Sequence, residues 1–312
     1  MKTRSFDRRA YPDGAVFSGW RAPDGWLHRR LDWPQPEGRA PRGTLLFAGG
    51  RGDFIEKYLE AMAHWHGQGW TVAGFDWRGQ GASRGDIAGG HLDSLDVLVD
   101  DLAALVAELA ARGEEPLVLI GHSMGGHVLL RALAEQRVRP AAAVLVAPML
   151  LVNSAPLPAW AAWSTAAFLS AVGWARQPAW RSPQPPPAAG SSRQGFLTSC
   201  PARYADELWW WEKEPGFSLG APSWGWLDAA YRSCARITGE RLREVEVPVL
   251  LLGTETDRLV SAAAIRRAAA LLPRARLKMF ARAGHEILRE ADPVRLDALA
   301  AIDDFLAEAA PR

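Results

Sequence analysis

Short apolar segments alternate with longer amphipathic segments along most of this chain. Each of the short segments is long enough for one strand, and most are apolar with almost no interruption: residues 44–48 (TLLFA), 70–75, 116–121 (PLVLIG), 141–146 and 248–252, with a further strand at 276–280 (RLKMF) that carries two basic residues. The amphipathic segments carry apolar residues at helical spacing and cover residues 54–68, 94–112, 123–136, 261–272 and 293–309. Because a strand covered on both faces is apolar throughout, this pattern predicts a mostly parallel sheet between two layers of helices. Two further strands, 16–21 and 26–32, flank a Pro-Asp-Gly turn and are predicted to pair antiparallel, which gives an eight-stranded α/β sheet.

One long segment lacks this alternation and has an unusual composition. Nine of the 15 tryptophans fall within it: Trp160, Trp163, Trp174, Trp180, Trp209, Trp210, Trp211, Trp224 and Trp226. It also holds a cluster of prolines, namely Pro178, Pro183, Pro185, Pro186 and Pro187. We therefore interpret residues 1–148 and 241–312 as two parts of one core, and residues 149–240 as a helical, tryptophan-rich insert.

The composition is that of an ordinary globular protein, with 312 residues and a formal net charge of +1. Nothing in it indicates a nucleic-acid partner. No apolar run reaches the length of a membrane span. The basic residues at the start are not followed by an apolar run of signal-peptide length; they are Lys2, Arg4, Arg8 and Arg9. We therefore expect a cytoplasmic protein. Cys200 and Cys234 have neither CxxC nor metal-ligand spacing, which predicts two free thiols and no metal.

The sequence Gly121-His122-Ser123-Met124-Gly125 places a serine where a buried strand ends and a helix begins. A Gly-x-Ser-x-Gly pattern is expected by chance about 0.1 times in such a chain, so its position carries the argument. The carboxyl end of a parallel strand is the edge of the sheet where ligands bind. Glycines two residues before and after the serine fit a sharp turn in which a Cβ would clash with nearby backbone. We predict that Ser123 is a nucleophile.

A serine hydroxyl needs a base to remove its proton and an acid to orient that base. His285 lies in a short loop after the strand at 276–280, at the same edge as Ser123. The other histidines are placed on strands or helices or beside the serine, pointing elsewhere; they are His28, His64, His66, His91, His122 and His127. Asp257 follows the strand at 248–252 and is the predicted acid, with Glu255 as a competitor. The order Ser123, Asp257, His285 is that of α/β-hydrolases.

The reaction also needs N–H donors for the oxyanion of the transition state. We assign one to Met124, the residue after the nucleophile, and the other to Arg51 in the loop after the strand at 44–48, with Gly50 as a close competitor. Two interpretations of the Arg51 side chain stay open, contact with an anionic group and exposure to solvent.

In these residues and the motifs around them, the chain resembles the lysophospholipase and monoacylglycerol-lipase branch of the α/β-hydrolase superfamily. The resemblance covers residues of about 30–148 and 240–308 and is carried by GGRGDFIEKY (49–58), FDWRGQGAS (75–83), LVLIGHSMGG (117–126), GTETDRLV (253–260) and AGHEILREADPVR (283–295). Many relatives have a His-Gly pair in the oxyanion loop where this chain has Gly49-Gly50, a version similar to that of bacterial lysophospholipases. We interpret the loop FDWRGQGAS as a structural turn, because it lacks the third glycine of a phosphate-binding fingerprint.

The resemblance implies an α/β-hydrolase fold and a serine hydrolase without a cofactor, in which the insert forms a helical cap over the active site. It favours hydrolysis of a glycerol-linked monoacyl lipid ester through an acyl-enzyme. The apolar segment 159–172 is either buried core of the cap or a surface for acyl chains and peripheral membrane contact. One alternative is an aminopeptidase of the same fold, whose cap carboxylates would bind a free amine (Asp206, Glu207, Glu212 and Glu214). Another is a slow-turnover receptor that retains the three residues.

Overall fold

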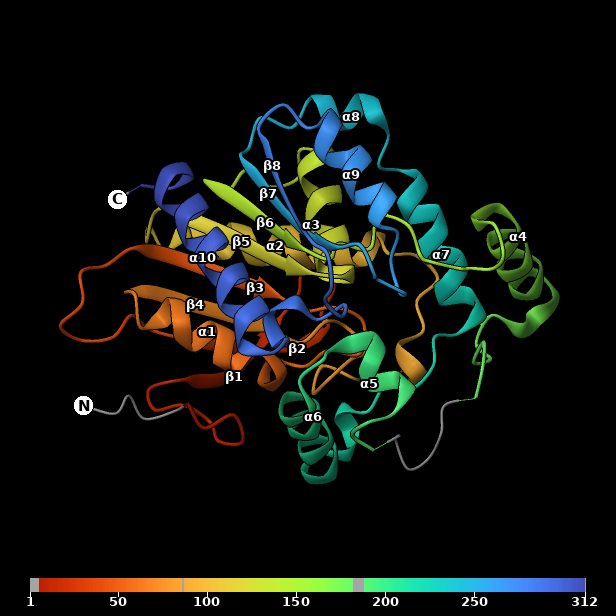
Figure 1. Ribbon diagram of the computed structural model, residues 1–312, viewed down its shortest axis with the longest axis horizontal. Helices are drawn as coiled ribbons and strands as arrows, with labels where there is room; N and C mark the ends of the chain where they lie inside the picture. The colour runs from red at the N-terminus through yellow and green to blue at the C-terminus, as the bar shows by residue number, and fades with distance from the viewer. Residues whose placement is uncertain (1–5, 86, 182–187, 312) are drawn as a thin grey trace.

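The computed structural model describes residues 6–85, 87–181 and 188–311, so that Lys2, Arg4 and the prolines from Pro183 to Pro187 lie outside the described residues. Its centre is one sheet with the strand order β1-β2-β4-β3-β5-β6-β7-β8 (Figure 1). β1 and β2 pair antiparallel, as does β2 with β4, and the other neighbours are parallel. The strands are β1 (Val16–Arg21), β2 (Leu27–Trp33), β3 (Gly43–Ala48), β4 (Trp70–Phe75), β5 (Leu117–His122), β6 (Ala142–Val146), β7 (Val249–Thr254) and β8 (Ala275–Phe280). The predicted eight-stranded, mostly parallel sheet is therefore confirmed.

The register of the central strands brings distant segments to one edge. Ala48 at the end of β3 is opposite Gly121 in β5, and His122 at the end of β5 is opposite Val146 at the end of β6. Thr254 and Phe280 are opposite each other at the ends of β7 and β8. The loops that follow these strands consequently meet at the same edge of the sheet, where ligands bind in open α/β folds.

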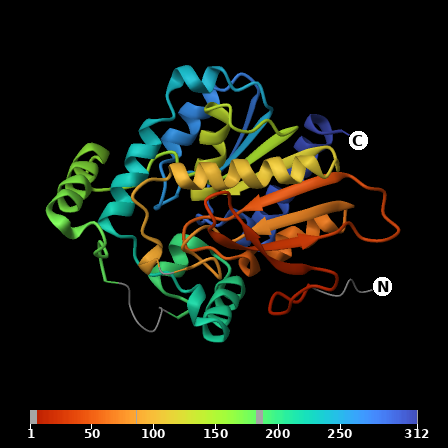
Figure 2. The same cartoon turned by 180° about the vertical axis from the view of Figure 1, so that it is seen from behind.

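Helices cover both faces of the sheet. α2 (Asp96–Ala111), α3 (Met124–Ala134) and α9 (Ala262–Leu271) pack on one face, and α1 (Leu59–His66) and α10 (Asp292–Ala309) pack on the other (Figures 1 and 2). Alternate residues of one strand contribute to opposite layers: Leu119 packs with α3, whereas Val118 and Ile120 pack on the side of α10. This two-sided burial explains why the central strands, such as β5 and β6, are apolar without alternation.

The predicted helix over residues 54–68 is wrong in its first turn. Residues Ile55–Tyr58 form a 3₁₀ turn, and the α-helix begins only at Leu59. Distant partners fix this turn: the Ile55 N–H donates to Asp76 Oδ1 at 3.0 Å, and Glu56 accepts two hydrogen bonds from Arg29 at 2.7 Å. Asp76 also accepts from the Ala82 N–H at 2.9 Å, so the loop FDWRGQGAS has the structural role predicted for it.

In the structure the predicted insert, residues 149–240, lies within the connection between β6 and β7; from here on the name insert refers to that whole connection, residues 147–248. Its helices are α4 (Ala159–Leu169), which continues into a π-helical turn (Ser170–Trp174), α5 (Ser192–Leu197), α6 (Pro201–Lys213), α7 (Trp224–Ala235) and α8 (Gly239–Arg243). α4 stands apart from the sheet in both views and is joined to the rest mainly by packing on α7 (Figures 1 and 2). Within the described residues, no helix is long and apolar enough to cross a membrane.

The tryptophans of the insert divide into packed and exposed groups. Trp210 and Trp226 are buried, whereas four others between residues 160 and 180 are exposed: Trp160, Trp163, Trp174 and Trp180. The three consecutive tryptophans of α6 diverge, as their helical spacing predicts. Trp210 packs against Phe54 and Phe217, Trp211 lies under the Arg193 guanidinium, and Trp209 contacts Lys213.

Candidate active site

Ser123 occupies the sharp turn between β5 and α3 with a backbone conformation that is unusual for a residue with a side chain. Its φ is 51° and its ψ is −114°. Such strain costs about 1–3 kcal/mol and persists only where the surroundings impose it. Here the Ser123 N–H donates to Val146 O at 2.9 Å, and the Ser123 carbonyl accepts from the Met149 N–H at 3.0 Å. The turn therefore presents the hydroxyl at the carboxyl edge of the sheet.

The glycines around Ser123 leave no room for a side chain, as predicted. A Cβ on Gly121 would lie 2.7 Å from Gly126 N, and a Cβ on Gly125 would lie 2.3 Å from Ala48 O. The contact at Gly125 is informative because Ala48 ends β3. The nucleophile turn and the loop after β3 thus touch backbone to backbone.

Three side chains from separate loops form a continuous hydrogen-bonded chain at this edge. His285 Nε2 lies 2.8 Å from Ser123 Oγ, and His285 Nδ1 lies 2.7 Å from Asp257 Oδ2. The other carboxylate oxygen of Asp257 accepts from the N–H groups of Leu259 at 2.8 Å and Val260 at 3.0 Å, which fixes its orientation. The structure brings together the three residues predicted from the sequence.

The electrostatics of this chain suit a histidine base. Burial by itself lowers the pKa of His285, but the Asp257 carboxylate outweighs burial and raises that pKa above its ordinary value. Burial raises the pKa of Asp257, whereas the charge and hydrogen bond of His285 produce a net lowering. Asp257 is therefore ionised at neutral pH and stabilises the imidazolium form of His285.

The competing candidates have other partners. Glu255 forms an ion pair with Arg266 on the surface. His122, next to the serine, directs Nδ1 to Tyr58 Oη and Asp53 Oδ2, both at 2.9 Å, rather than to Ser123. The remaining histidines pair with groups outside this chain of contacts: His28 with Asp101, His64 with Asp303, His66 with Pro34 O, His91 with Ser223 and His127 with Ser233.

Met124 and the loop after β3 supply the candidate N–H donors for an oxyanion. Gly50 of this loop lies against Ser123, because a Cβ there would lie 2.9 Å from Ser123 Cβ. Its N–H, however, donates to Asp53 Oδ2 at 2.6 Å. Among the described residues, the N–H groups of Arg51 and Met124 have no hydrogen-bond acceptor. This geometry favours Arg51 over its competitor Gly50 as the second donor.

A family model described as Serine aminopeptidase, S33 (Hydrolase_4) matches residues 39–292. The chain belongs to this family. It is 27% identical over 280 residues to a probable lysophospholipase L2 of Haemophilus influenzae, with 87% of this chain and 86% of the relative covered. Lysophospholipase L2 of Escherichia coli is 28% identical over 285 residues, with 84% and 79% covered. These matches confirm the resemblance to lysophospholipases found in the sequence.

Solved structures confirm the α/β-hydrolase fold of this Hydrolase_4 protein. A soluble variant of monoglyceride lipase from Saccharomyces cerevisiae, in complex with a substrate analogue, matches with a TM-score of 0.74 at 17% identity, covering 97% of this chain and 99% of that chain. The monoacylglycerol lipase of Paleococcus ferrophilus matches with a TM-score of 0.69 at 21% identity, covering 91% and 99%.

In this Hydrolase_4 chain, the insert holds the backbone of the His285 loop directly. The N–H of His285 donates to Phe196 O at 3.0 Å, and the N–H of Glu286 donates to Leu197 O at 2.8 Å. Gly284 permits this approach, since a Cβ there would lie 2.4 Å from Leu197 O. The carboxyl end of α5 is thus part of the support of His285.

The Arg51 side chain neither contacts an anionic group nor extends into solvent, the two interpretations that the sequence left open. Its guanidinium donates to Gly220 O of the insert at 3.0 Å and to Gly89 O at 2.9 Å, and it lies over the Trp226 ring. The side chain therefore connects the oxyanion loop to the insert. Within the described residues, no cluster of histidine, cysteine, aspartate or glutamate side chains could hold a metal ion.

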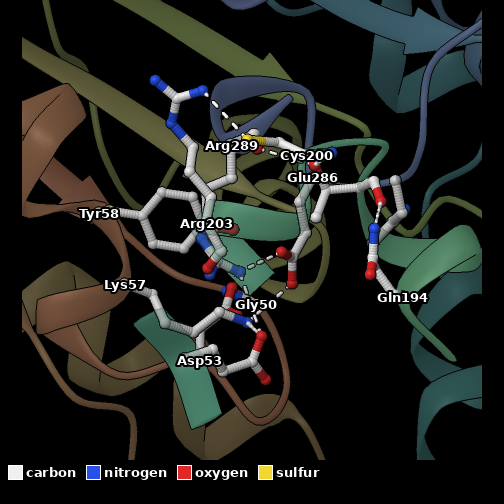
Figure 3. A network of polar contacts seen from close by, with 12 residues as sticks. Gly50, Asp53, Lys57, Tyr58, Gln194, Cys200, Arg203, Glu286 and Arg289 are labelled. Atoms are coloured by element: carbon white, nitrogen blue, oxygen red, sulfur yellow. Dashed lines mark hydrogen bonds and ion pairs between the residues drawn. The ribbon is translucent and has the colours of Figure 1, made fainter. Parts of the chain in front are cut away.

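The sequence reasoning missed a buried network of charged residues behind the oxyanion loop. Figure 3 shows Asp53, Lys57, Glu286 and Arg289 gathered there with Tyr58. The spacing of Asp53 and Lys57, four residues apart, is a sequence signal for an ion pair. It could not reveal that the pair is buried, because Glu286 and Glu207, which complete the network, lie far away in the sequence.

Proposed function

We propose that this protein is a serine hydrolase that cleaves carboxylic esters of monoacyl lipids, lysophospholipids or monoacylglycerols, through an acyl-enzyme. The observation that carries the proposal is the chain of contacts from Ser123 Oγ through His285 to Asp257, at 2.8 Å and 2.7 Å, beside two free N–H groups. These are the nucleophile, base, orienting acid and oxyanion donors that acyl transfer requires.

We assign each step of the proposed reaction to a residue on the basis of this geometry. His285 Nε2 takes the Ser123 proton as Oγ attacks the ester carbonyl, and the N–H groups of Met124 and Arg51 bind the oxyanion. His285 then gives the proton to the departing alcohol, which leaves Ser123 acylated. In the second half His285 removes a proton from water, which attacks the acyl group and releases the acid and free Ser123. Asp257 holds Nδ1 and stabilises the imidazolium formed in each half.

The proposed substrate class is supported by the names of the relatives, and a separate observation concerns the role of the insert. Two relatives carry the name lysophospholipase, and two structural neighbours are monoglyceride or monoacylglycerol lipases. We propose that the insert acts as a cap, since α5 contacts the His285 loop and Gly220 contacts Arg51.

The cap carboxylates give no support to the aminopeptidase alternative, although the family description names that activity. Asp206 pairs with Arg8 and Arg9, and Glu207 pairs with Arg193 and Arg289. Glu212 and Glu214 are exposed at the end of α6. None is a free buried carboxylate for the amine of a peptide.

We also propose that α4 contacts the surface of a lipid aggregate or membrane. Its sequence, AWAAWSTAAFL, contains no charged residue, and only Ala166 within it is buried. Trp160 is 71% exposed and Phe168 is 64% exposed. A helix with exposed tryptophan and phenylalanine that stands apart from the core is suited to the interfacial region of lipids.

The proposed function is tested with the wild type and Ser123→Ala on 1-acyl lysophosphatidylcholine, monoacylglycerol, p-nitrophenyl esters and aminoacyl anilides. We expect ester turnover in the wild type and a loss of roughly 10⁴-fold or more in the variant, because the attacking atom is removed. A fluorophosphonate probe should label the wild type and leave Ser123→Ala unlabelled. Ser18→Ala, on the exposed edge strand β1, is the matched control and should retain full turnover.

Three results would contradict the proposal in different ways. Equal turnover in Ser123→Ala would exclude the mechanism, and faster cleavage of anilides than of esters would favour the peptidase. Binding of the lipid without turnover would favour the receptor.

A further inference from the structure

The buried ammonium of Lys57 contacts carboxylates from three separate parts of the chain. Its Nζ lies 2.6 Å from Asp53 Oδ1 in the loop after β3, 2.7 Å from Glu286 Oε1 next to His285, and 3.5 Å from Glu207 Oε2 in α6. The Lys57 side chain is 3% exposed. None of these contacts belongs to the chain of Ser123, His285 and Asp257.

The first carboxylate connects Lys57 to the oxyanion loop. Asp53 uses Oδ1 for Lys57, and it uses Oδ2 to accept from the Gly50 N–H at 2.6 Å and to contact His122 Nδ1 at 2.9 Å. Gly50 immediately precedes Arg51, whose N–H faces no acceptor of its own. The Asp53 N–H also donates to Gly50 O at 3.4 Å, so that Asp53 holds the peptides on both sides of Gly50, including the one that carries the Arg51 N–H.

The second carboxylate connects Lys57 to the base. Glu286 is the residue after His285, and its backbone N–H is held by Leu197 O at 2.8 Å. Its side chain accepts from Lys57 with Oε1 and from Arg289 with Oε2. Lys57 thus lies between the loop that supplies the oxyanion donor and the loop that supplies the base (Figure 3).

The charges of this group balance. Asp53, Glu207 and Glu286 supply three carboxylates, and Lys57, Arg193 and Arg289 supply three cations. Burial opposes the charge on Lys57, but the three carboxylates outweigh it and raise its pKa above the ordinary value. Removing only the ammonium leaves Asp53 and Glu286 buried and facing each other without a shared cation.

We propose that Lys57 is a positioning residue for ester hydrolysis, which sets the oxyanion loop and the His285 loop at their working separation by binding Asp53 and Glu286 together. This inference rests on the function proposed above. The Lys57 ammonium is enclosed by the three carboxylates. It acts through Gly50 and through the residue next to the base.

The positioning role has an electrostatic signature at His285. The groups that face this imidazole are Asp257 and Ser123 at its two nitrogens, the His122 ring at 4.9 Å between centroids, and the carboxylates of Glu286 and Asp53. Besides Asp257, Glu286 and Asp53 raise the pKa of His285. Removal of the Lys57 charge strengthens their effect, and removal of the Glu286 charge weakens it.

The test compares Lys57→Met with the wild type on a soluble p-nitrophenyl ester, with rates normalised to the sites that a fluorophosphonate labels. We expect kcat to fall about 10- to 100-fold, as for displaced catalytic groups, with KM within about twofold. The low-pH limb of kcat/KM should move to higher pH, because the base must be neutral and its pKa rises. Lys213→Met makes the same chemical change at the exposed end of α6 and should match the wild type.

Glu286→Gln provides a second variant that keeps the shape of the side chain. It should move the low-pH limb in the opposite direction, to lower pH, and lower kcat less than Lys57→Met does. If Lys57→Met fails to fold, the kcat of Glu286→Gln decides, because this variant breaks the same bridge from Lys57 to the His285 loop and should lower kcat at unchanged KM. A role limited to stability would leave kcat per labelled site at the wild-type value in both variants.

The outcomes separate this inference from the proposed function. An inactive wild type that the probe does not label would reject the function itself. An active wild type with unchanged kcat in Lys57→Met would overturn the positioning role, as would an unchanged kcat in Glu286→Gln when Lys57→Met does not fold.

Discussion

At the scale of single residues, Gly125 shows how the nucleophile turn depends on close backbone packing. A Cβ at this position would lie 2.3 Å from Ala48 O and 2.4 Å from Gly49 O. Neither atom belongs to a flexible side chain, so the strand β3 or the oxyanion loop would have to move. The position of the nucleophile turn therefore depends on the position of the oxyanion loop, and the reverse is also true.

We predict that Gly125→Ala lowers the free energy of unfolding by roughly 1–3 kcal/mol, as for other overpacked sites. Ester turnover should fall about 100-fold, because the loop that carries the Arg51 N–H is displaced. Urea denaturation and p-nitrophenyl ester assays measure the two effects. Gly195→Ala in α5 is the matched control, since no atom lies within 4 Å of the added Cβ, and it should not be destabilised.

At the scale of elements, α4 and α5 play opposite roles within the insert. α5 holds the N–H groups of His285 and Glu286 and belongs structurally to the site. α4 buries only Ala166 and contacts the core through α7, where Trp163 Nε1 donates to Asp228 Oδ1 at 3.0 Å. The apolar exposed surface of α4 is therefore available to an external lipid phase.

We predict that Trp160→Ser combined with Phe168→Ser weakens binding to phosphatidylcholine vesicles by about tenfold or more, because two large apolar groups no longer enter the interface. Turnover of a soluble p-nitrophenyl ester should stay within about twofold. Vesicle co-sedimentation measures the binding. Leu296→Ser, on the exposed side of α10, serves as the control. Unchanged vesicle binding in the double variant would exclude α4 as the surface that contacts lipid.

At the scale of the whole molecule, the charged network joins the two parts of the core and the insert. Asp53 and Lys57 come from the first part of the core, Glu207 from the insert, and Glu286 and Arg289 from the second part. Despite burial, Arg289 and Lys57 lower the pKa of Glu286 to about 2. The network is therefore a source of stability that depends on pH.

A carboxyl group whose pKa is lowered by folding stabilises the folded state above its unfolded pKa, and this contribution is lost as the pH falls through the folded pKa. For Glu286 the window lies between its ordinary value of 4.5 and about 2. We predict that, as the pH falls through this window, the free energy of unfolding decreases more steeply in the wild type than in Glu286→Gln, by up to about 1.4 kcal/mol per pH unit. The reason is that unfolding of the variant takes up one proton fewer. Urea midpoints across the window measure the difference, and Glu212→Gln on the exposed end of α6 should keep the slope of the wild type. Identical slopes in the wild type and Glu286→Gln would contradict the prediction.

The sequence by itself determined the sheet, the order of Ser123, Asp257 and His285, and the crowding at Gly121 and Gly125. Those features depend on local patterns: apolar runs, turn glycines and the position of a residue just after a strand. Only the tertiary structure decided that Asp257 rather than Glu255 meets His285, that the Gly50 N–H is occupied by Asp53, and that α5 supports the base. It also decided that Lys57 is buried among three carboxylates. These outcomes depend on which distant segments meet, and the free energy of a buried charge is set by those neighbours rather than by its place in the sequence.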